Sequence, residues 1–414
     1  MTSRERVKAA VERREPDRVP IDLSSHPSSG ISALAYARVK QRLGLTGGEV
    51  FVYDVIQGLA QPENAILDLF GVDAIDLGRV FLTEPHDRRH WTLIDGTDAL
   101  APAYFNPEPD GDGGWLFRGA DDQIIGVMPK GQPFITQTHW PLAGGVTDEA
   151  LVNLPHHMQQ VTWGNPSLTI APWHRPMDGK WLAEVERRAR RLRAASDRAI
   201  MLGFGGNLLE WSQFLRGPEG FFLDLAGDPQ AAHALLDRLT ELHIEGLRWV
   251  LPALGPHIDI IRMGDDLGTQ AGPQISPAMY REYFLPRHRA IYSEVKRHCD
   301  AYVFLHSCGG IYELMPMLIE AGVEIINPVQ TSARNMEPER LKREFGRDIC
   351  FWGGGCETQS TLIHGTPSQV RDEVRRRRQT LGAGGGFVFC QVHNILPDVP
   401  PENVIAMFEA AREG

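Results

Sequence analysis

A histidine and a cysteine two residues apart form the stretch of this sequence that is best suited to chemistry. His306 and Cys308 follow the apolar run at residues 302–305 and precede two glycines. Because side chains on a strand alternate between its faces, these two residues point the same way. An imidazole and a thiolate are both zinc ligands, so the pair predicts one half of a zinc site at the end of a strand.

Three later residues are candidates to complete this zinc site. Cys356 follows three consecutive glycines, and Cys390 and His393 end the last apolar run of the chain. A catalytic zinc ion takes three protein ligands and keeps one position open. Cys356 is our first choice, because the glycines allow the backbone to approach a site closely. Cys390 and His393 are alternatives as a third or fourth ligand, and on a regular strand only one of the two faces inward.

Acidic and amide side chains follow the same apolar runs. We expect them to orient a substrate or to handle protons; these candidate catalytic residues are Asp265, Asp266, Asn327, Gln330, Glu357 and His393. Of the two adjacent aspartates, we expect one to cap a turn and the other to face a pocket. Weaker candidates for pocket lining are His26, Tyr53, Trp173, Asn207 and Trp211.

Short apolar runs alternate with helical patterns along most of the chain, and these elements must position the candidate residues. The runs cover residues 19–23, 73–77, 199–204, 258–263, 301–305, 323–327, 349–352 and 386–392. Such alternation predicts parallel strands joined by right-handed helical crossovers. No G-x-G-x-x-G motif follows an early strand, so we predict an α/β fold of the (β/α)₈ TIM barrel type rather than a doubly wound sheet. In such a barrel the functional side chains lie at the carboxyl ends of the strands.

The sequence predicts one barrel domain over residues 1–414, with two additions. Residues 3–14 have a helical pattern and form an N-terminal extension. From about residue 90 to 134, Gly, Asp and Pro separate short alternating runs. This pattern is typical of antiparallel strands, so we expect a small β insertion there.

Charge and composition narrow the class of partner. The chain has 414 residues, 42% of them hydrophobic, and a formal net charge of -11. An acidic surface disfavours nucleic acid or an anionic membrane as the main partner. The N-terminus is polar and no apolar run is long enough to span a bilayer, so we expect a cytoplasmic protein. Five cysteines in such a protein favour free thiols and metal binding over disulfides.

Several motifs resemble those of the uroporphyrinogen decarboxylase superfamily and, within it, the zinc-dependent, corrinoid-linked methyltransferases. They lie at residues 15–20 (EPDRVP), 264–268 (GDDLG), 306–309 (HSCG), 327–330 (NPVQ), 353–359 (GGGCETQ) and 392–403 (VHNILPDVPPEN). The resemblance covers most of the chain and is most specific from about residue 258 onward. It implies a (β/α)₈ barrel that holds Zn²⁺ through His306, Cys308 and a later residue. Cys356 and His393 each match that later position in different subgroups.

The resemblance also implies a reaction and a partner. A member of this branch would move a methyl group between a small substrate and a corrinoid (cobalamin). The substrate would be a methoxylated aromatic, or the acceptor a thiol or a folate. No D-x-H-x-x-G motif of a corrinoid carrier occurs in this chain, so the corrinoid would arrive on a partner protein. The resemblance is compatible with a homodimer.

Two other functions remain as alternatives. The first is a metal-free decarboxylase of the uroporphyrinogen type, whose acidic tetrapyrrole substrate is met by arginines near the N-terminus. The matching region here, residues 21–30, contains no arginine. The second alternative is a non-catalytic barrel with a structural zinc ion, which would have four protein ligands and no open position.

Overall fold

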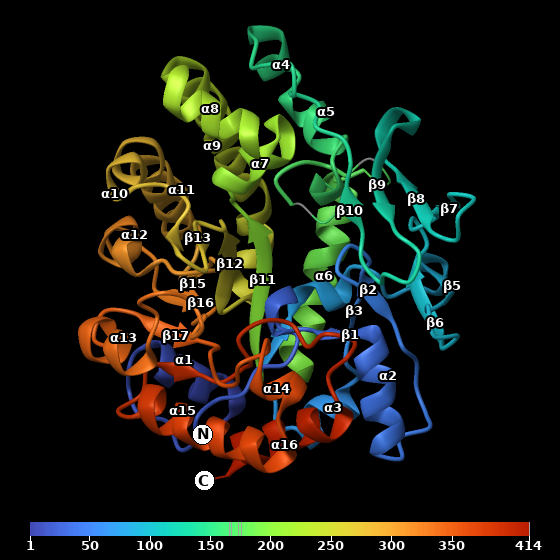
Figure 1. The fold of residues 1–414 in the computed structure, drawn as a ribbon, viewed down its shortest axis with the longest axis vertical. Helices are drawn as coiled ribbons and strands as arrows, with labels where there is room; N and C mark the ends of the chain where they lie inside the picture. The colour runs from blue at the N-terminus through green and yellow to red at the C-terminus, as the bar shows by residue number, and fades with distance from the viewer. Residues whose placement is uncertain (165, 167, 173, 175, 414) are drawn as a thin grey trace.

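Seven parallel strands form the central sheet of the computed structural model, which describes residues 1–164, 166, 168–172, 174 and 176–413. Their order across the sheet is β18-β17-β16-β15-β12-β11-β4 (Figure 1). The strands are β4 (Ala74–Asp76), β11 (Ala199–Gly205), β12 (Ile260–Gly264), β15 (Tyr302–His306), β16 (Ile325–Asn327), β17 (Cys350–Trp352) and β18 (Phe387–Val388). Each lies within or beside an apolar run that the sequence predicts as a strand.

A short segment at Ile21 and Asp22 joins the two edges of this sheet. Ile21 pairs in parallel with Phe389, directly after β18, and Asp22 pairs in parallel with Ala74 of β4. The backbone N–H of Asp22 donates to the Phe389 carbonyl at 2.8 Å, and the N–H of Phe389 donates to the Pro20 carbonyl at 2.8 Å. The segment takes the place of an eighth strand, and the predicted TIM barrel is confirmed.

Apolar side chains fill the interior of the barrel. They form a core cluster of their own, whose members on or just after the strands are Ala74, Ala199, Met201, Ile260, Phe304, Ile325, Cys350, Trp352, Val388 and Cys390. Helix α1 (Ser3–Val11) adds Val7, Ala10 and Val11 to the same cluster. The N-terminal extension therefore closes the amino-terminal end of the barrel, and the opposite, carboxyl end is left for a site.

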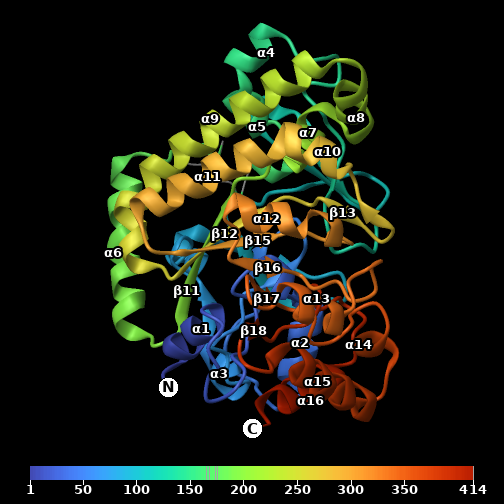
Figure 2. The same ribbon diagram turned by 90° about the vertical axis from the view of Figure 1, so that its left-hand side faces the viewer.

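Helices cover the outside of the barrel (Figures 1 and 2). The longer ones are α2 (Ala33–Arg42), α6 (Gly179–Ala195), α8 (Pro218–Gly227), α9 (Pro229–Leu254), α11 (Leu285–His298), α15 (Pro367–Gly382) and α16 (Pro401–Arg412). The shorter ones are α3 (Asn64–Leu69), α4 (Asp148–Val152), α5 (Leu154–Gln159), α7 (Leu209–Arg216), α10 (Pro277–Met279), α12 (Met315–Ala321), α13 (Pro338–Phe345) and α14 (Thr361–His364). In the part of the chain that the structure describes, no helix is both long and apolar enough to cross a bilayer.

Small antiparallel sheets lie beside the barrel, and those formed by residues 88–137 are at the right of Figure 1. The predicted β insertion is present as β5 (Arg88–Thr92) paired with β6 (Asp98–Pro102), and as a second sheet. That sheet contains β7 (Glu108–Pro109), β8 (Trp115–Arg118), β9 (Ile124–Met128) and β10 (Thr136–Gln137). A third sheet, which the sequence did not predict, contains β1 (Ile31–Ser32), β2 (Val52–Asp54) and β3 (Leu59–Ala60). A hairpin of β13 (Gly268–Thr269) and β14 (Gly272–Pro273) follows β12.

Candidate metal and substrate site

His306, Cys308 and His393 bring their side chains together at the carboxyl end of the barrel. One ligand atom from each residue lies within 4.8 Å of the other two. Nε2 of His306 is 3.3 Å from Sγ of Cys308, and the ring centroids of His306 and His393 are 6.0 Å apart. Two imidazoles and a thiol are donors that zinc accepts, and three ligands leave one position open. The donor set therefore fits a catalytic zinc ion.

Asn327 fixes the orientation of the His306 ring. The amide nitrogen of Asn327 donates to the Trp352 carbonyl at 2.8 Å, so its Oδ1 is the atom that faces Nδ1 of His306, at 2.7 Å. Nδ1 must then carry the proton and donate, and Nε2 keeps a free lone pair on the side of Cys308. Ser28 Oγ lies 3.1 Å from the same Nδ1. Burial lowers the pKa of His306 to about 3, so the ring is neutral at ordinary pH.

The loops after β12 and β15 are held together at Cys308. The backbone N–H of Cys308 donates to Oδ1 of Asp266 at 2.8 Å, and that oxygen is 3.5 Å from Nε2 of His306. Gly309 has φ +86°, and a Cβ there would lie 2.3 Å from the carbonyl carbon of Gly268. Only glycine allows this approach of the two loops. Burial raises the pKa of the Cys308 thiol well above its usual value, and the charge of Asp266 acts in the same direction.

The two adjacent aspartates have different surroundings. Asp265 is fully buried and accepts the backbone N–H groups of Leu209 and Glu210, each at 3.0 Å, at the start of α7. Nε2 of His288 is 3.2 Å from the same carboxylate. A carboxylate at a helix N-terminus stabilises the helix. Asp265 is therefore a helix cap that does not line the pocket, and Asp266 is the aspartate that does.

The side chains of His306, Cys308 and His393 are called the metal group below. Cys356, our first choice as the third ligand, does not join this group. Its Sγ lies 3.9 Å from Oε2 of Glu373 on α15, and burial raises the pKa of its thiol. The glycines before it have a packing role, because a Cβ at Gly355 would lie 2.3 Å from the ring of Phe389. In this geometry His393, an alternative of the sequence analysis, occupies the third place beside His306 and Cys308.

Cys390 belongs to a different group of side chains. Its Sγ, a carboxylate oxygen of Asp22 and a ring nitrogen of His26 lie within 4.8 Å of one another, and all three residues are buried. The Asp22 carboxylate accepts the indole N–H of Trp352 at 2.8 Å. Cys390 is thus an interior residue of the barrel, on a level below His393.

Gln330 and Glu357 are likewise not among the residues that line the pocket. Oε1 of Gln330 accepts the backbone N–H of Gly309 at 2.7 Å, so this side chain supports the loop that carries Cys308. The Glu357 carboxylate accepts the hydroxyl of Thr331 at 2.9 Å. Both side chains hold loops in this structure.

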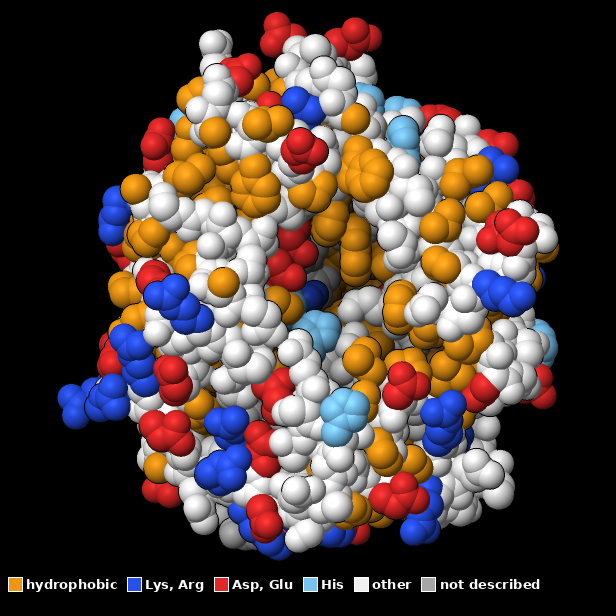
Figure 3. Space-filling model, in the orientation of Figure 1, with side chains coloured by type: hydrophobic (Ala, Val, Ile, Leu, Met, Phe, Trp, Pro, Cys, Tyr) orange, Lys and Arg blue, Asp and Glu red, His pale blue; other side chains and the backbone are white. Residues whose placement is uncertain are grey.

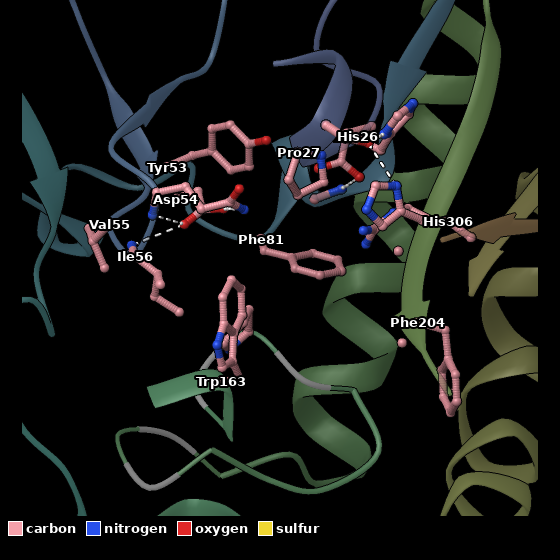
Figure 4. Close-up of a pocket in the computed structure, with 18 of the residues that line it drawn as sticks. His26, Pro27, Tyr53, Asp54, Val55, Ile56, Phe81, Trp163, Phe204 and His306 are labelled. Carbon is pink, nitrogen blue, oxygen red and sulfur yellow. Dashed lines mark hydrogen bonds between the residues drawn. The ribbon is translucent and has the colours of Figure 1, made fainter. Parts of the chain in front are cut away.

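A cavity of about 380 Å³ lies beside the metal group. It opens as a hollow in the middle of the face shown in Figure 3. In Figure 4, Tyr53 and Asp54 lie on one side of it, His26 and His306 on another, and Trp163 projects between them. Its aromatic lining residues are Phe51, Tyr53, Phe81, Tyr104, Trp163, Phe204, Trp211 and Phe214. Of the weaker sequence candidates, His26, Tyr53, Asn207 and Trp211 line the cavity, and Trp173 lies outside the described residues.

Besides Asp54 and Asp76, the sequence analysis missed Glu210 and Arg262 among the acidic and basic residues that line the cavity. Glu210 receives hydrogen bonds from the Asn207 amide and from the backbone N–H of Asp266. Burial raises the pKa of Glu210 well above its usual value, and the charge of Asp266 adds to this effect. Arg262 projects from β12, and burial lowers its pKa. The signal for Arg262 was available, because an arginine in the middle of an apolar strand is unusual.

Comparisons with known proteins agree with this fold. A model of the family "Uroporphyrinogen decarboxylase (URO-D)" matches residues 172–414, more than half of the chain. The uroporphyrinogen decarboxylase of Pseudomonas fluorescens is 27% identical over 193 residues, which cover 46% of this chain and 50% of that protein. The enzyme of the same name from Chlorobium phaeobacteroides is 26% identical over 231 residues, which cover 52% of this chain and 60% of that protein. The chain thus spans about half the length of the curated relatives it matches.

One solved structure shares the fold over nearly the whole chain. It is a methyltransferase from Methanosarcina mazei, 18% identical, with a TM-score of 0.57 over 99% of this chain and 98% of that one. Its agreement extends to the N-terminal part of the chain, which the family model does not match. From the match over residues 172–414, the chain belongs to the uroporphyrinogen decarboxylase (URO-D) family.

Proposed function

We propose that this protein is a zinc-dependent methyltransferase. It moves a methyl group between a small substrate and a corrinoid that a partner protein carries. The observation that carries the proposal is the convergence of His306, Cys308 and His393 within 4.8 Å at the edge of an aromatic cavity. The three side chains offer a zinc ion three ligands and leave one position for a substrate.

The residues around this group have separate roles in the proposed reaction. His306, Cys308 and His393 hold the zinc ion, which when bound keeps a substrate thiol ionised or withdraws charge from an ether oxygen. Asn327 keeps Nε2 of His306 free of a proton. Burial raises the pKa of Glu210 well above its usual value and so favours the protonated carboxyl, the form that donates a proton inside the cavity.

The corrinoid partner is supported by the fold and by the sequence. The structural neighbour from Methanosarcina mazei, whose fold extends over almost the whole of this chain, is a methyltransferase. The sequence has no D-x-H-x-x-G motif for a corrinoid of its own. We further propose that the chain works as one domain in the cytoplasm, with the β insertion beside the mouth of the cavity.

A metal-free decarboxylase is the second candidate, and it is favoured by the curated relatives, which are uroporphyrinogen decarboxylases. The charges in the cavity oppose it. Among the described residues that line the cavity, Arg262 is the only lysine or arginine, and it is accompanied by four carboxyl groups. A tetrapyrrole with many carboxylates requires a more basic site.

Methyl transfer can be followed with free cobalamin in place of the partner protein. Zinc-loaded protein, reduced cobalamin and a methoxylated aromatic are mixed, and methylcobalamin is detected by its absorbance. We expect methylcobalamin to accumulate, and we expect a zinc chelator to abolish its formation. Turnover that persists after zinc is removed contradicts the proposal and favours a metal-free reaction.

A further inference from the structure

Arg262 is a half-buried cation that forms no hydrogen bond or ion pair with a described residue, although the charges of Glu210, Asp266 and Asp76 act on it. Its residue lies on β12, in register with Gly203 on β11 and with Phe304 on β15. Nε of Arg262 is buried and has no hydrogen-bond partner. Within the described ranges, no carboxylate forms an ion pair with its guanidinium, although the side chain lines the cavity. A guanidinium stays charged in a protein interior, so an unpaired one strongly favours an anion.

The carboxyl groups of the cavity already have other partners. Asp54, Asp76, Glu210 and Asp266 each accept at least one hydrogen bond from a backbone N–H group. Burial also raises the pKa of Asp54, and it raises the pKa of Asp76 to about 6. These groups therefore offer Arg262 less negative charge than four free carboxylates would. A ligand carboxylate would give Arg262 the direct ion pair that these four groups do not form with it.

The structure leaves room for that ligand beside Arg262. Gly203 is exposed to the cavity although it lies in the middle of β11, and a Cβ added there would meet no atom within 4 Å. The absence of a side chain at Gly203 thus opens the strand next to the arginine. A ligand group can reach the guanidinium from this side.

The aromatic walls of the cavity favour a ligand that contains a flat ring. Tyr53, Phe81, Trp163 and Phe204 line the space in front of the strands (Figure 4). Aromatic side chains pack against flat rings with a gain beyond the buried area. The cavity of about 380 Å³ has the size of a small-molecule site.

We propose that Arg262 binds the carboxylate of a planar aromatic substrate, so that the protein acts on methoxylated aromatic acids. This inference deepens the proposed function, because it names the substrate class of the same site. Arg262 is in register with Phe304, and His306 lies two residues further along β15. The two backbone positions are therefore roughly 6.6 Å apart along the strands. A ring held by its carboxylate at Arg262 is directed toward the metal group.

Binding can be measured without any methyl transfer. The probes are para-methoxybenzoate and its uncharged counterpart para-methoxybenzamide, titrated calorimetrically into chelator-treated and zinc-loaded protein. We expect the acid to bind wild-type protein about tenfold to a hundredfold more tightly than the amide, as for a hydrogen bond to a charged group. In Arg262→Met the acid loses this advantage and the amide keeps its affinity. Arg262→Lys retains part of the advantage, because the charge remains but the paired donors are lost.

Gly203→Val is the matched control for the location of the probes. Its side chain projects into the cavity beside Arg262, so it should weaken acid and amide alike. Equal binding of acid and amide to wild-type protein, no binding of the acid, or an acid preference that survives in Arg262→Met would overturn the proposal. Unchanged binding in Gly203→Val would overturn it as well. Because binding is read in the absence of corrinoid, such a failure is distinct from a failure of zinc binding or of methyl transfer.

Discussion

Asn327 decides, at the scale of single residues, which nitrogen of His306 is available to a metal. Its Oδ1 accepts from Nδ1 of His306, because its amide nitrogen is engaged by the Trp352 carbonyl. A hydrogen bond to the ring nitrogen of a histidine that does not bind the metal contributes about tenfold to a hundredfold in metal affinity. We expect Asn327→Leu to lose zinc affinity by about that factor. Competition with a chromophoric chelator measures the change.

Asn106→Leu serves as the control for the Asn327 experiment. Asn106 is an exposed residue of the β insertion, where it accepts a hydrogen bond from Arg89. The Asn106→Leu protein should bind zinc with the affinity of the wild type. If Asn327→Leu also keeps the wild-type affinity, the orientation of His306 does not depend on Asn327.

His243 gives the fold a pH dependence of its own. Nδ1 of this buried ring is 2.9 Å from the Thr169 hydroxyl and Nε2 is 2.9 Å from the Asn207 carbonyl. Burial lowers its pKa to about 4, against an unfolded value of about 6.5. A group whose pKa falls on folding contributes stability above its unfolded pKa, and this contribution is lost as the pH falls from 6.5 toward 4.

The contribution of His243 amounts to about 3 kcal/mol in the free energy of unfolding between these two pH values. We expect urea unfolding of the wild type to show this loss. His243→Gln cannot titrate, so its curve against pH should be shallower by that amount. Parallel curves for wild type and variant would contradict the assignment.

Asp73 joins three elements at the amino-terminal end of the barrel. Its buried carboxylate accepts from the Ile21 backbone N–H at 2.8 Å, from Arg6 of α1 at 2.6 Å and from Arg18 at 2.7 Å. It thus holds together helix α1, the segment at Ile21 and Asp22 that joins the two edges of the sheet, and the start of β4. Removal of one member of a buried ion pair leaves the other uncompensated, at a cost of about 3–5 kcal/mol.

We therefore expect Asp73→Asn to lower the free energy of unfolding by about 3 kcal/mol or more in urea. Asp68→Asn is the control, because Asp68 pairs with Arg198 and its side chain is 69% exposed. Exposed pairs contribute about 0–1 kcal/mol, so this variant should remain close to the wild type. A similar small effect in both variants would show that Asp73 does not hold the elements together.

The strands of the barrel were predictable because buried parallel strands are short continuous apolar runs. The closing segment at Ile21 and Asp22 lies in such a run, and α1 was predicted from the helical pattern of residues 3–14. Side-chain alternation did not predict which of the three candidates, Cys356, Cys390 and His393, lies beside His306 and Cys308. Gly353 and Gly354 have φ values of +93° and +82°, so the chain turns after β17 and the period of two ends before Cys356. After β18 the backbone also leaves the regular strand conformation. As a result, His393 lies in the metal group at the carboxyl end of the barrel, whereas Cys390 lies in the interior.

At the scale of the whole molecule, the metal group and the wall of the cavity come from different parts of the chain. His306, Cys308 and His393 lie within residues 172–414, which match the family. Tyr53, Phe81 and much of the remaining aromatic wall precede residue 172. The fold of the family thus positions the candidate metal ligands, and a region outside the family match contributes much of the aromatic wall of the cavity. This division explains why the residues that resemble the family predict the metal and do not identify the substrate.

Zinc content measured on purified variants tests the central claim most directly. Wild-type protein should bind about one zinc ion per chain, and His306→Ala, Cys308→Ser and His393→Ala should each lose most of it. Cys356→Ser should retain the wild-type content, because that thiol faces Glu373. Full zinc occupancy in both His306→Ala and Cys308→Ser would contradict the account. Loss of zinc in Cys356→Ser with retention in His393→Ala would contradict the assignment of the third ligand.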